Sequence, residues 1–342
     1  MQKILIRTPN HLGDCLMAQP SIRTLSESLQ NCEIFLLTPT WASPIYGSIQ
    51  NSAILPLSSD IMHGYKGIKS QIILLKNDLF DTAVLMTPSF SSAMILYLAG
   101  IKNRFGYNTD RRRIFLNHPV DSGMAKTIHR HQSYYKLMEY FAGHSLPFYP
   151  PRLITQSESH KAADKILHES GFNSDSSFIV IAPQAVAESR RWGTDNYASL
   201  ARKLISDLGI SVILIGTSSE FQAGDKITFG EKRIFNLCGK TNIADAAAIM
   251  SKAKLFIGND SGLAHLAAAV DIPLVILSGA DKPSETSPIS DKKTVIIKNY
   301  LKCISCVKND CRQKSEAFMR CMIDISVDEV LAASKNLLEI WR

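Results

Sequence analysis

Short apolar runs and longer amphipathic stretches alternate along the first half of the chain. Runs rich in Ile, Leu and Val at 3–7, 33–37 and 82–86 are bounded by polar turns, which predicts buried strands. Stretches with helical spacing follow at about 14–29 and 91–98. Because strands alternate with helices, the pattern predicts an α/β fold with a parallel sheet.

The alternation starts again in the second half, where strands are predicted at 178–182, 212–215, 255–257 and 274–277. Between the halves, 146–151 holds three prolines, which favour a stiff, extended link. We therefore expect two Rossmann-like domains, 1–150 and 151–326, and a final helix in 327–342. Such a pair places the carboxyl ends of two parallel sheets across a cleft, where ligands of open α/β sheets bind.

Composition excludes several classes of protein. The chain has 342 residues, of which 45% are hydrophobic and 20% charged, which is ordinary for a globular protein and unlike a disordered one. No apolar run reaches the roughly 18 residues that span a bilayer, and residues 1–9 lack a signal-peptide pattern, so we expect a cytoplasmic protein. The net charge of +7 favours an anionic substrate, an acidic membrane face or nucleic acid.

Familiar nucleotide-binding motifs are missing or incomplete. The sequence has no GxGxxG, which removes the main support for a dinucleotide-dependent dehydrogenase. Gly239-Lys-Thr241 ends like a P-loop, but Ile234 stands where a P-loop starts with glycine, so Thr241 or Asn242 is expected to cap a helix instead. In the sequence GNDSG, Asp260 occupies the serine position of a hydrolase elbow.

The segment 255–269 predicts a strand that leads through a polar turn into a helix of small residues. The free N–H groups at the start of that helix favour an anion such as phosphate, and Gly262 lets a ligand approach closely. Ser261 is then either a helix cap or a phosphate contact. The alternative is an ordinary cap, with His265 packed in the core.

Two further loops follow predicted strands and carry candidate chemistry. In the second half, Arg190 and Arg191 either bind a diphosphate or form a solvated surface, and Trp192 beside them is either packing or a ligand contact. In the first half, Asp14 either takes a proton from an acceptor hydroxyl or caps the helix that it opens.

Four of the seven cysteines crowd one segment, Cys303, Cys306, Cys311 and Cys321. They are separated by two, four and nine residues, which departs from the spacing of common zinc ribbons. In a reducing compartment such a cluster suggests a structural zinc or iron ion before disulfides. Free thiols or redox-labile pairs are the alternatives, and nothing in the sequence places the cluster at a reaction centre.

Several short motifs are distributed over nearly the whole chain, and their order along it is informative. They are Gly13-Asp14 and the segments 99–106, 189–192, 239–241, 259–265 and 303–322. This ordered set resembles the ADP-heptose:lipopolysaccharide heptosyltransferases. The resemblance implies a GT-B architecture with an acceptor-binding N-terminal domain, a C-terminal domain that binds the nucleotide sugar, and a last helix that packs back toward the first domain.

The function implied is transfer of heptose from ADP-L-glycero-D-manno-heptose to the inner core of lipopolysaccharide, with inversion and without a metal or cofactor at the reaction centre. Asp14 matches the family's catalytic base, which would deprotonate a heptose or Kdo hydroxyl. Arg190 stands beside the donor phosphate, where the family commonly has lysine. The other implied donor-binding residues are Ser189, Arg191, Thr217 by the ribose, Thr241 by the adenine, Asp260 by the sugar hydroxyls, and Ser261, Gly262 and His265 around the diphosphate.

The acceptor-binding residues expected in the N-terminal domain are Asn10, Gly13, Ser89, Arg112 and Arg113. Further positive charge comes from Arg104, Arg111, Lys126 and Arg130. This charge would meet the phosphates and Kdo carboxylates of an inner-core acceptor, and a solvated basic face is the alternative. The expected partners are therefore ADP-heptose and a lipid A–Kdo-type acceptor, with peripheral contact at the inner face of the inner membrane and no nucleic acid.

Three alternative functions stay open. A glycosyltransferase of the same fold would use another nucleotide sugar, or a protein or glycan acceptor. A nucleotide-sugar epimerase of the same shape would not need Gly13-Asp14 in this form. A nucleic-acid binder would use the charge and the cysteines, but the basic residues are dispersed and the sequence has no aromatic-basic RNA signature.

Overall fold

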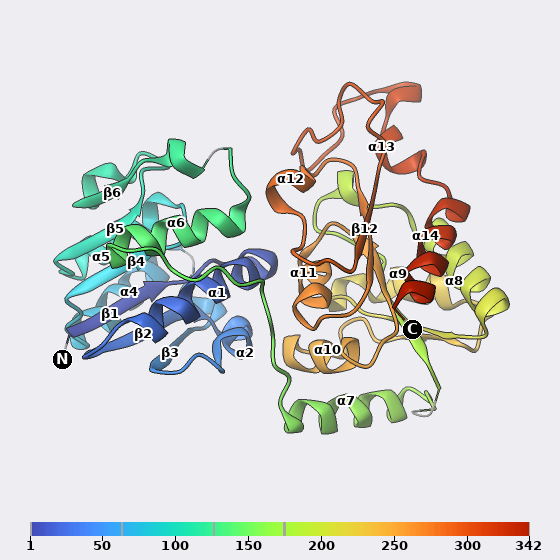
Figure 1. The fold of residues 1–342 in the computed structure, drawn as a ribbon, viewed down its shortest axis with the longest axis horizontal. Coiled ribbons are helices and arrows are strands. Elements are labelled where there is room, and N and C mark those ends of the chain that lie inside the picture. The colour runs from blue at the N-terminus through green and yellow to red at the C-terminus, as the bar shows by residue number, and fades with distance from the viewer. Residues whose placement is uncertain (1, 63, 126, 174–175, 342) are drawn as a thin grey trace. The chain divides into compact units, whose positions relative to one another are not determined.

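The computed structural model describes residues 2–62, 64–125, 127–173 and 176–341. The chain divides into two compact units, Met1–Pro151 and Arg152–Arg342, so the proline-rich link ends the first unit. Each unit is a parallel sheet covered by helices, as Figure 1 shows. Two residues named above, Lys126 and the last residue of 327–342, lie outside the described residues. Within the described ranges, no helix has the length and apolar character that a membrane span requires.

The first unit contains a six-stranded sheet in the order β3-β2-β1-β4-β5-β6. Its strands are β1 (Gln2–Arg7), β2 (Cys32–Pro39), β3 (Ser52–Leu57), β4 (Thr82–Leu85), β5 (Asn103–Tyr107) and β6 (His118–Val120). The chain adds β2 and β3 on one side of β1 and then returns to add β4 on the other side. The strand order therefore reverses between β1 and β4, and ligands of open sheets bind at the carboxyl ends of strands beside such a switch point.

Helices pack in pairs on this sheet (Figure 1). They are α1 (Leu12–Ser28), α2 (Ser43–Tyr46), α3 (Ser59–Met62), α4 (Gly64–Asn77), α5 (Phe90–Leu98) and α6 (Arg130–Ala142). The pairs are α1 with α6 and α4 with α5. Helix α1 starts at Leu12, two residues before the predicted start, and Pro20 lies inside it without ending it. The N-cap is His11, so Asp14 lies in the first helical turn and is not the cap.

The second unit contains a six-stranded sheet in the order β12-β11-β10-β7-β8-β9. Its strands are β7 (Phe178–Ala182), β8 (Ser211–Leu214), β9 (Ile234–Asn236), β10 (Phe256–Asn259), β11 (Leu274–Ser278) and β12 (Lys293–Ile297). Strands β7, β8, β10 and β11 are buried along their whole length. A parallel strand covered on both faces needs a continuous apolar run, which is why these strands are visible in the sequence. The switch point of this sheet lies between β7 and β10.

The helices of the second unit are α7 (Ser157–Glu169), α8 (Thr194–Leu208), α9 (Phe221–Thr228), α10 (Ile243–Met250), α11 (Gly262–Ala269), α12 (Pro283–Thr286), α13 (Arg320–Ile323) and α14 (Val327–Ile340). Helix α7 packs against α10, and α8 packs against α9 and α14. Val330, Leu331 and Leu337 of α14 belong to the hydrophobic core of the second unit, because the apolar face of this helix is buried against α8 and β11. Packing of this last helix toward the first domain stays a prediction.

Candidate functional site

Three loops at the carboxyl ends of the second sheet carry charged side chains. Arg190 follows β7, Asp260 follows β10 and Asp281 follows β11. The backbone ties these loops together, since Trp192 N–H donates to Asn259 Oδ1 at 3.2 Å and Asp260 N–H donates to the end of β11 at 3.0 Å. Two residues that the sequence predicts in one site, Arg190 and Asp260, are therefore brought together at the switch point.

Arg190 and Asp281 form an ion pair in this site. Arg190 Nε lies 2.9 Å from Asp281 Oδ1. The Asp281 side chain is 6% exposed and that of Arg190 is 31% exposed, so the pair is anchored inside the protein and open on its outer side. Asp281 is not among the residues that the sequence predicts in this site. Its only signal is its position in the loop that directly follows a predicted strand.

Burial shifts the pKa values of the charged groups here. Burial, followed by the charge of Asp281, raises the pKa of Asp260 to about 7, although Arg190 and Lys293 act in the opposite direction. Burial raises the pKa of Asp281 to about 6 against the lowering effect of Arg190. Burial also lowers the pKa of Lys293, and Asp260 partly offsets this effect. Two acids and two cations thus share a poorly solvated space.

Four buried oxygen atoms at this site have no hydrogen-bond partner among the residues that the structure describes. They are Asp260 Oδ2, Asp281 Oδ2, Ser261 Oγ and Ser278 Oγ. An unsatisfied buried polar atom costs about 1–3 kcal/mol, so a cluster of them points to a ligand. Sugar hydroxyls both donate and accept hydrogen bonds, and they would satisfy all four oxygens.

Helix α11 begins at this cluster. Its N-cap, Ser261, has an extended backbone with φ of −149° and ψ of 174°, and its side chain makes no capping hydrogen bond. Gly262 is the first helical residue, and His265 lies buried in the first turn. The N–H groups at the start of a helix attract an anion, so the three predicted diphosphate residues share one helix start.

Thr217 and Thr241 lie on two other loops of this unit, and the structure brings these loops together. Thr217 caps a short turn in which its N–H donates to Glu220 Oε2 at 2.7 Å. Gly239 has a φ of +77°, and a Cβ there would lie 2.7 Å from Ser218 Cα. Glycine is therefore required where the loop before Thr241 touches the loop after Thr217.

Two predicted donor contacts, Ser189 and Arg191, hydrogen-bond to backbone oxygens, and their role in donor binding stays a prediction. Ser189 is buried, its hydroxyl donates to Lys308 O at 2.5 Å, and its N–H donates to Asn309 O at 3.0 Å. Arg191 donates from Nε to Ala185 O at 2.8 Å within its own loop. The sequence could not reveal these contacts because the partners of Ser189 are about 120 residues away.

The cysteine segment lies against the same site. Ser305 N–H donates to Gly279 O at 2.9 Å, and Val307 N–H donates to Ala280 O at 2.7 Å. These bonds hold the turn that carries Asp281. The sequence alone does not indicate this contact between the cysteine segment and the Asp281 turn.

The four cysteines lie near one another. Burial, and then the nearby charges of Cys311, Cys303 and Cys306, raise the pKa of Cys321 to about 11. All four are free thiols, and Cys303 and Cys306 are exposed. In the described part of the chain, no group of three or more His, Cys, Asp or Glu side chains is placed to hold a metal ion. A structural zinc or iron ion at these cysteines stays a prediction.

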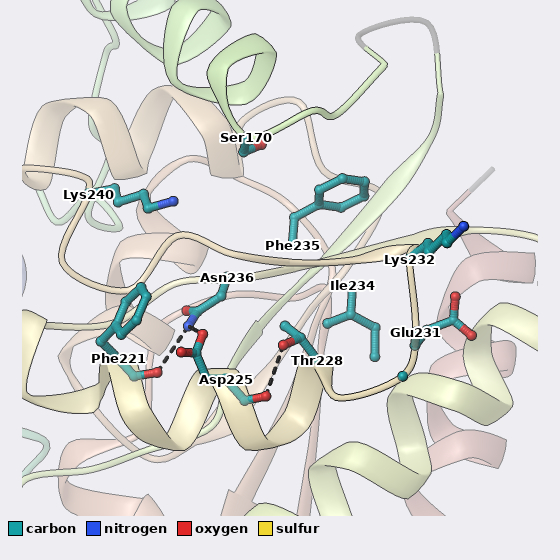
Figure 2. A pocket seen from close by; sticks show the side chains of 11 residues that line it. Ser170, Phe221, Asp225, Thr228, Glu231, Lys232, Ile234, Phe235, Asn236 and Lys240 are labelled. Atoms are coloured by element: carbon teal, nitrogen blue, oxygen red, sulfur yellow. Dashed lines mark hydrogen bonds between the residues drawn. The ribbon is translucent and has the colours of Figure 1, made fainter.

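A separate hollow of about 610 Å³ lies at the outer edge of the second sheet, beside β9 and α9 (Figure 2). Asn236 donates from Nδ2 to Phe221 O at 3.0 Å and to Asp225 Oδ1 at 2.8 Å, so its amide group is already paired. Lys240 and Phe235 also line it. None of the predicted site residues lines this hollow, and we assign no part of the reaction to it.

In the first unit, the loop after β1 leads into α1 and places Asp14 on the first turn. Tyr134 of α6 donates to Asp14 Oδ1 at 3.1 Å, and Arg130 Nη1 lies 3.5 Å from the same oxygen. Burial, and then the charge of Asp14, raise the pKa of Tyr134 well above its usual range, so Tyr134 remains a donor. The Asp14 side chain is 17% exposed, which leaves it accessible to a substrate.

The loop that leads from β1 into α1, just before Asp14, is held by the side chain of Arg7. Arg7 is buried and donates to Asn10 Oδ1 at 2.8 Å and to Leu37 O at 3.2 Å. Asn10 and Gly13 are half-buried on this loop, at the carboxyl end of β1 where the sequence predicts them. The acceptor role of these two residues stays a prediction.

Ser89 follows β4, on the other side of the switch point, and caps α5 by accepting a backbone N–H at 3.3 Å. Arg112 is buried and donates from Nε to Tyr107 O at 2.9 Å and from Nη1 to Thr87 O. A guanidinium enclosed by backbone carbonyls is not available to an acceptor, so Arg112 has a structural role instead of the expected one. Arg113 is exposed.

Comparison with known proteins identifies relatives over the whole chain. The model of glycosyltransferase family 9 (heptosyltransferase) matches residues 71–316. Lipopolysaccharide heptosyltransferase 2 of Salmonella typhimurium is 31% identical, over 98% of this chain and 98% of its own length. The solved structure of Escherichia coli ADP-heptose lipopolysaccharide heptosyltransferase II has a TM-score of 0.80 and 27% identity, with 99% of each chain covered. A family 9 glycosyltransferase structure from Veillonella parvula has a TM-score of 0.84 and 18% identity, with 99% of this chain and 97% of that chain covered.

Two six-stranded parallel sheets, each with charged groups at its switch point, define a glycosyltransferase of GT-B architecture, as the sequence predicts. The chain belongs to glycosyltransferase family 9, the heptosyltransferase family. The resemblance stated from the sequence motifs is thereby confirmed, and the protein is an enzyme.

Proposed function

We propose that this enzyme transfers heptose from ADP-L-glycero-D-manno-heptose to the inner core of lipopolysaccharide, with inversion at the anomeric carbon. The relative from Salmonella typhimurium is a lipopolysaccharide heptosyltransferase, which supports this acceptor class. One observation carries the proposal. Two buried acids, two cations and four unpartnered oxygens surround the start of α11. Such a site suits a ligand that combines a hydroxyl-rich sugar with a diphosphate.

The donor binds in the second unit. Asp260 accepts hydrogen bonds from the heptose hydroxyls, while the N-terminus of α11 and Arg190 hold the diphosphate. Thr217 and Thr241, on their adjoining loops, contact the adenosine. Negative charge develops on the departing ADP as the bond between the anomeric carbon and the phosphate oxygen breaks. The helix N–H groups and the guanidinium stabilise that charge, which is the larger share of the catalytic task.

Asp14 is the general base. It accepts the proton of the acceptor hydroxyl while that oxygen bonds to the anomeric carbon on the face opposite ADP, and the electron pair of the broken bond leaves with ADP. Tyr134 and Arg130 both contact Oδ1 and fix the orientation of the carboxylate. The reaction requires Asp14 and the donor site to act on the same pair of substrates, and this requirement is part of the proposal.

The acceptor is anionic and attached to lipid, and a matching surface lies on the first unit. Ile114 is 75% exposed and directly follows Arg113, and both Arg111 and Arg113 are exposed. Next to it, Phe115 packs 5.5 Å from the ring of Tyr97, which is also exposed. Apolar side chains among basic ones suit the headgroup region of an anionic membrane. We place peripheral membrane contact at this surface, which we call the Ile114 surface and define by these five residues.

In this proposal the reaction centre needs no metal ion. The positive charge that offsets the leaving diphosphate comes from Arg190, Lys293 and the start of α11. EDTA is therefore expected to leave the rate of ADP release unchanged. Activity that is lost in EDTA and restored by zinc or iron would contradict this part of the proposal.

Replacing Asp14 by asparagine tests the role of the base. The amide keeps the shape of the carboxylate and cannot accept the proton, so turnover is expected to fall by about 10²- to 10⁴-fold. Binding of ADP, measured by calorimetry, should be nearly intact because the donor site lies in the other unit. Asp60→Asn, at an exposed acid of the same unit, is the matched control and should retain full turnover. Wild-type turnover in Asp14→Asn would remove Asp14 as the base.

A further inference from the structure

The three guanidinium nitrogens of Arg190 differ in their surroundings. Nε faces Asp281 Oδ1 at 2.9 Å. This contact is an ion pair, since Nε is buried and has no hydrogen-bond partner among the described residues. Because the guanidinium is planar, an anionic partner beside Nε restricts the plane and leaves Nη1 and Nη2 for the outer side, where 31% of the side chain is exposed.

The turn that carries Asp281 is fixed by close packing. A Cβ at Gly279 would lie 2.6 Å from Met322 Sδ and 2.9 Å from Cys321 Sγ, so α13 leaves no room for the turn to move. Val307 N–H donates to Ala280 O on the residue before Asp281. Asp281 is therefore a rigid anchor. Its Oδ2 is one of the buried oxygens without a partner in the described chain, so this carboxylate also faces the cluster at α11.

The loop that carries Arg190 is held by the same segment. Ser189 bonds to the backbone oxygens of Lys308 and Asn309, directly after Val307. One stretch of backbone, 305–309 between the cysteines, thus contacts both the Asp281 turn and the Arg190 turn. We call this stretch the brace. Its contacts hold this long irregular segment at the site.

We propose that Asp281 is a positioning residue for the donor site, which fixes the Arg190 guanidinium so that its two terminal nitrogens grip the donor diphosphate as a pair. The brace holds the Asp281 turn and the Arg190 turn in fixed positions relative to each other. This inference rests on the proposed function, because the diphosphate is the ligand that it names. It adds a residue for which the sequence motifs give no role.

The chemistry of arginine explains why an anchor is useful here. A lysine presents one compact ammonium group and needs no partner to orient it. An arginine contacts a phosphate with two parallel N–H bonds only when its plane is aligned, and an unanchored long side chain loses rotamer freedom on binding. Asp281 removes this cost before the donor arrives. An arginine at this position therefore benefits from an acid such as Asp281 beside it.

Steady-state kinetics and ADP calorimetry test the inference first. In Asp281→Asn the guanidinium loses its charged partner, so we expect kcat/KM for ADP-heptose and the affinity for ADP each to fall by about tenfold. Asp271→Asn is the matched control, since Asp271 pairs with Lys292 at 2.9 Å at the opposite end of β11. The control should behave as the wild type. Unchanged or tighter ADP binding in Asp281→Asn would mean that Asp281 competes with the phosphate for Arg190, and the inference would be wrong.

A double-mutant cycle separates positioning from a general structural effect. In an Arg190→Lys background there is no guanidinium plane to orient, so Asp281→Asn should cost less than about threefold in ADP affinity, against about tenfold in the wild-type background. Equal losses in both backgrounds would assign Asp281 to structure alone. Thermal unfolding of each variant checks that all four proteins are folded.

The contact itself can be tested without any ligand. In the ¹H–¹⁵N spectrum of arginine side chains, Arg190 Nε–H should give a signal that exchanges slowly with solvent and that disappears in Asp281→Asn. If the wild type neither binds ADP nor turns over ADP-heptose, the proposed function fails while this signal still reports the pair. A rapidly exchanging Arg190 signal in the wild type would overturn the inference even if the enzyme is active.

Discussion

A buried carboxyl group that holds its proton near neutral pH lies in the proposed donor site. Asp260 has an ordinary value of 3.8 and a pKa of about 7 in the fold, because burial and the charge of Asp281 outweigh Arg190 and Lys293. Without a ligand, such a group destabilises the native state. In the proposed complex, hydrogen bonds from the sugar hydroxyls to Asp260 would offset this destabilisation. The free protein is therefore less stable at this residue than it would be if the residue had no role in binding.

The sign of this effect is testable by urea unfolding at two pH values. Between about pH 4 and pH 7 the folded state holds a proton on Asp260 that the unfolded state releases, so stability falls as the pH rises through this window and stays low above it. In the absence of ligand, Asp260→Asn should raise the free energy of unfolding at pH 8, by on the order of 3 kcal/mol, and change it little at pH 4. A variant that is less stable than the wild type at pH 8 would contradict the assigned charge state.

Sequence reasoning places residues that belong to a local motif, while their roles stay predictions. Asp260 lies on the loop after β10, and Asp14 lies in the first turn of α1, close to where the pattern predicts them. It fails where partners are distant in the chain, because nothing local links Tyr134 to Asp14 across 120 residues. For Arg112 the charge suggested a ligand, whereas burial among carbonyl groups gives it a structural role. Trp192 is core packing, since its indole N–H donates to Ile325 O at 2.8 Å.

At the scale of elements, the fully buried strands and the helix caps are what the sequence predicts best. Asn242 caps α10 by accepting from Asp245 N–H at 2.9 Å, as one of the two proposed caps. The elements that α14 packs against cannot be predicted from its sequence, because the apolar face of an amphipathic helix can pack against any apolar surface. The same holds for the brace, whose contacts are made by backbone groups and leave no side-chain signal.

Gly279 tests the packing of α13 against the Asp281 turn. In Gly279→Ala the new methyl group would overlap Met322 Sδ and Cys321 Sγ, so we expect a loss of about 1–3 kcal/mol in the free energy of unfolding and weaker ADP binding. Gly47→Ala is the control, because its nearest neighbour is an ordinary 3.8 Å away and its φ of −62° suits alanine. Urea unfolding and calorimetry give both readouts. Wild-type stability and ADP affinity in Gly279→Ala would show that the turn is not tightly packed.

At the scale of the whole molecule, the net charge of +7 indicates a kind of partner only where basic residues lie beside exposed apolar ones. Scattered lysines and arginines do not select a partner, and the family to which the chain belongs is identified by its relatives and not by its charge. The GT-B fold was predictable because each unit repeats the strand–helix pattern around its own core. The Ile114 surface was not, because exposure of a side chain is a property of the folded chain.

Vesicle co-sedimentation tests the Ile114 surface on the full chain. Ile114→Asp replaces an inserting apolar side chain by a charge that anionic lipids repel, so binding to vesicles rich in phosphatidylglycerol should fall at least severalfold. Leu79→Asp makes the same change at an exposed leucine that is not part of this surface, and it should bind as the wild type does. Equal binding by both variants would place the membrane contact elsewhere.

The central claim is that an activated heptose is held at the start of α11 and passed to a lipopolysaccharide core hydroxyl. The most direct measurement is ADP release from ADP-heptose with core acceptors of defined length, either free of heptose or carrying one heptose. The account predicts release that requires both ADP-heptose and one of these acceptors, and that stops in Asp14→Asn. No release with any core acceptor, or faster transfer from a different nucleotide sugar, would contradict it.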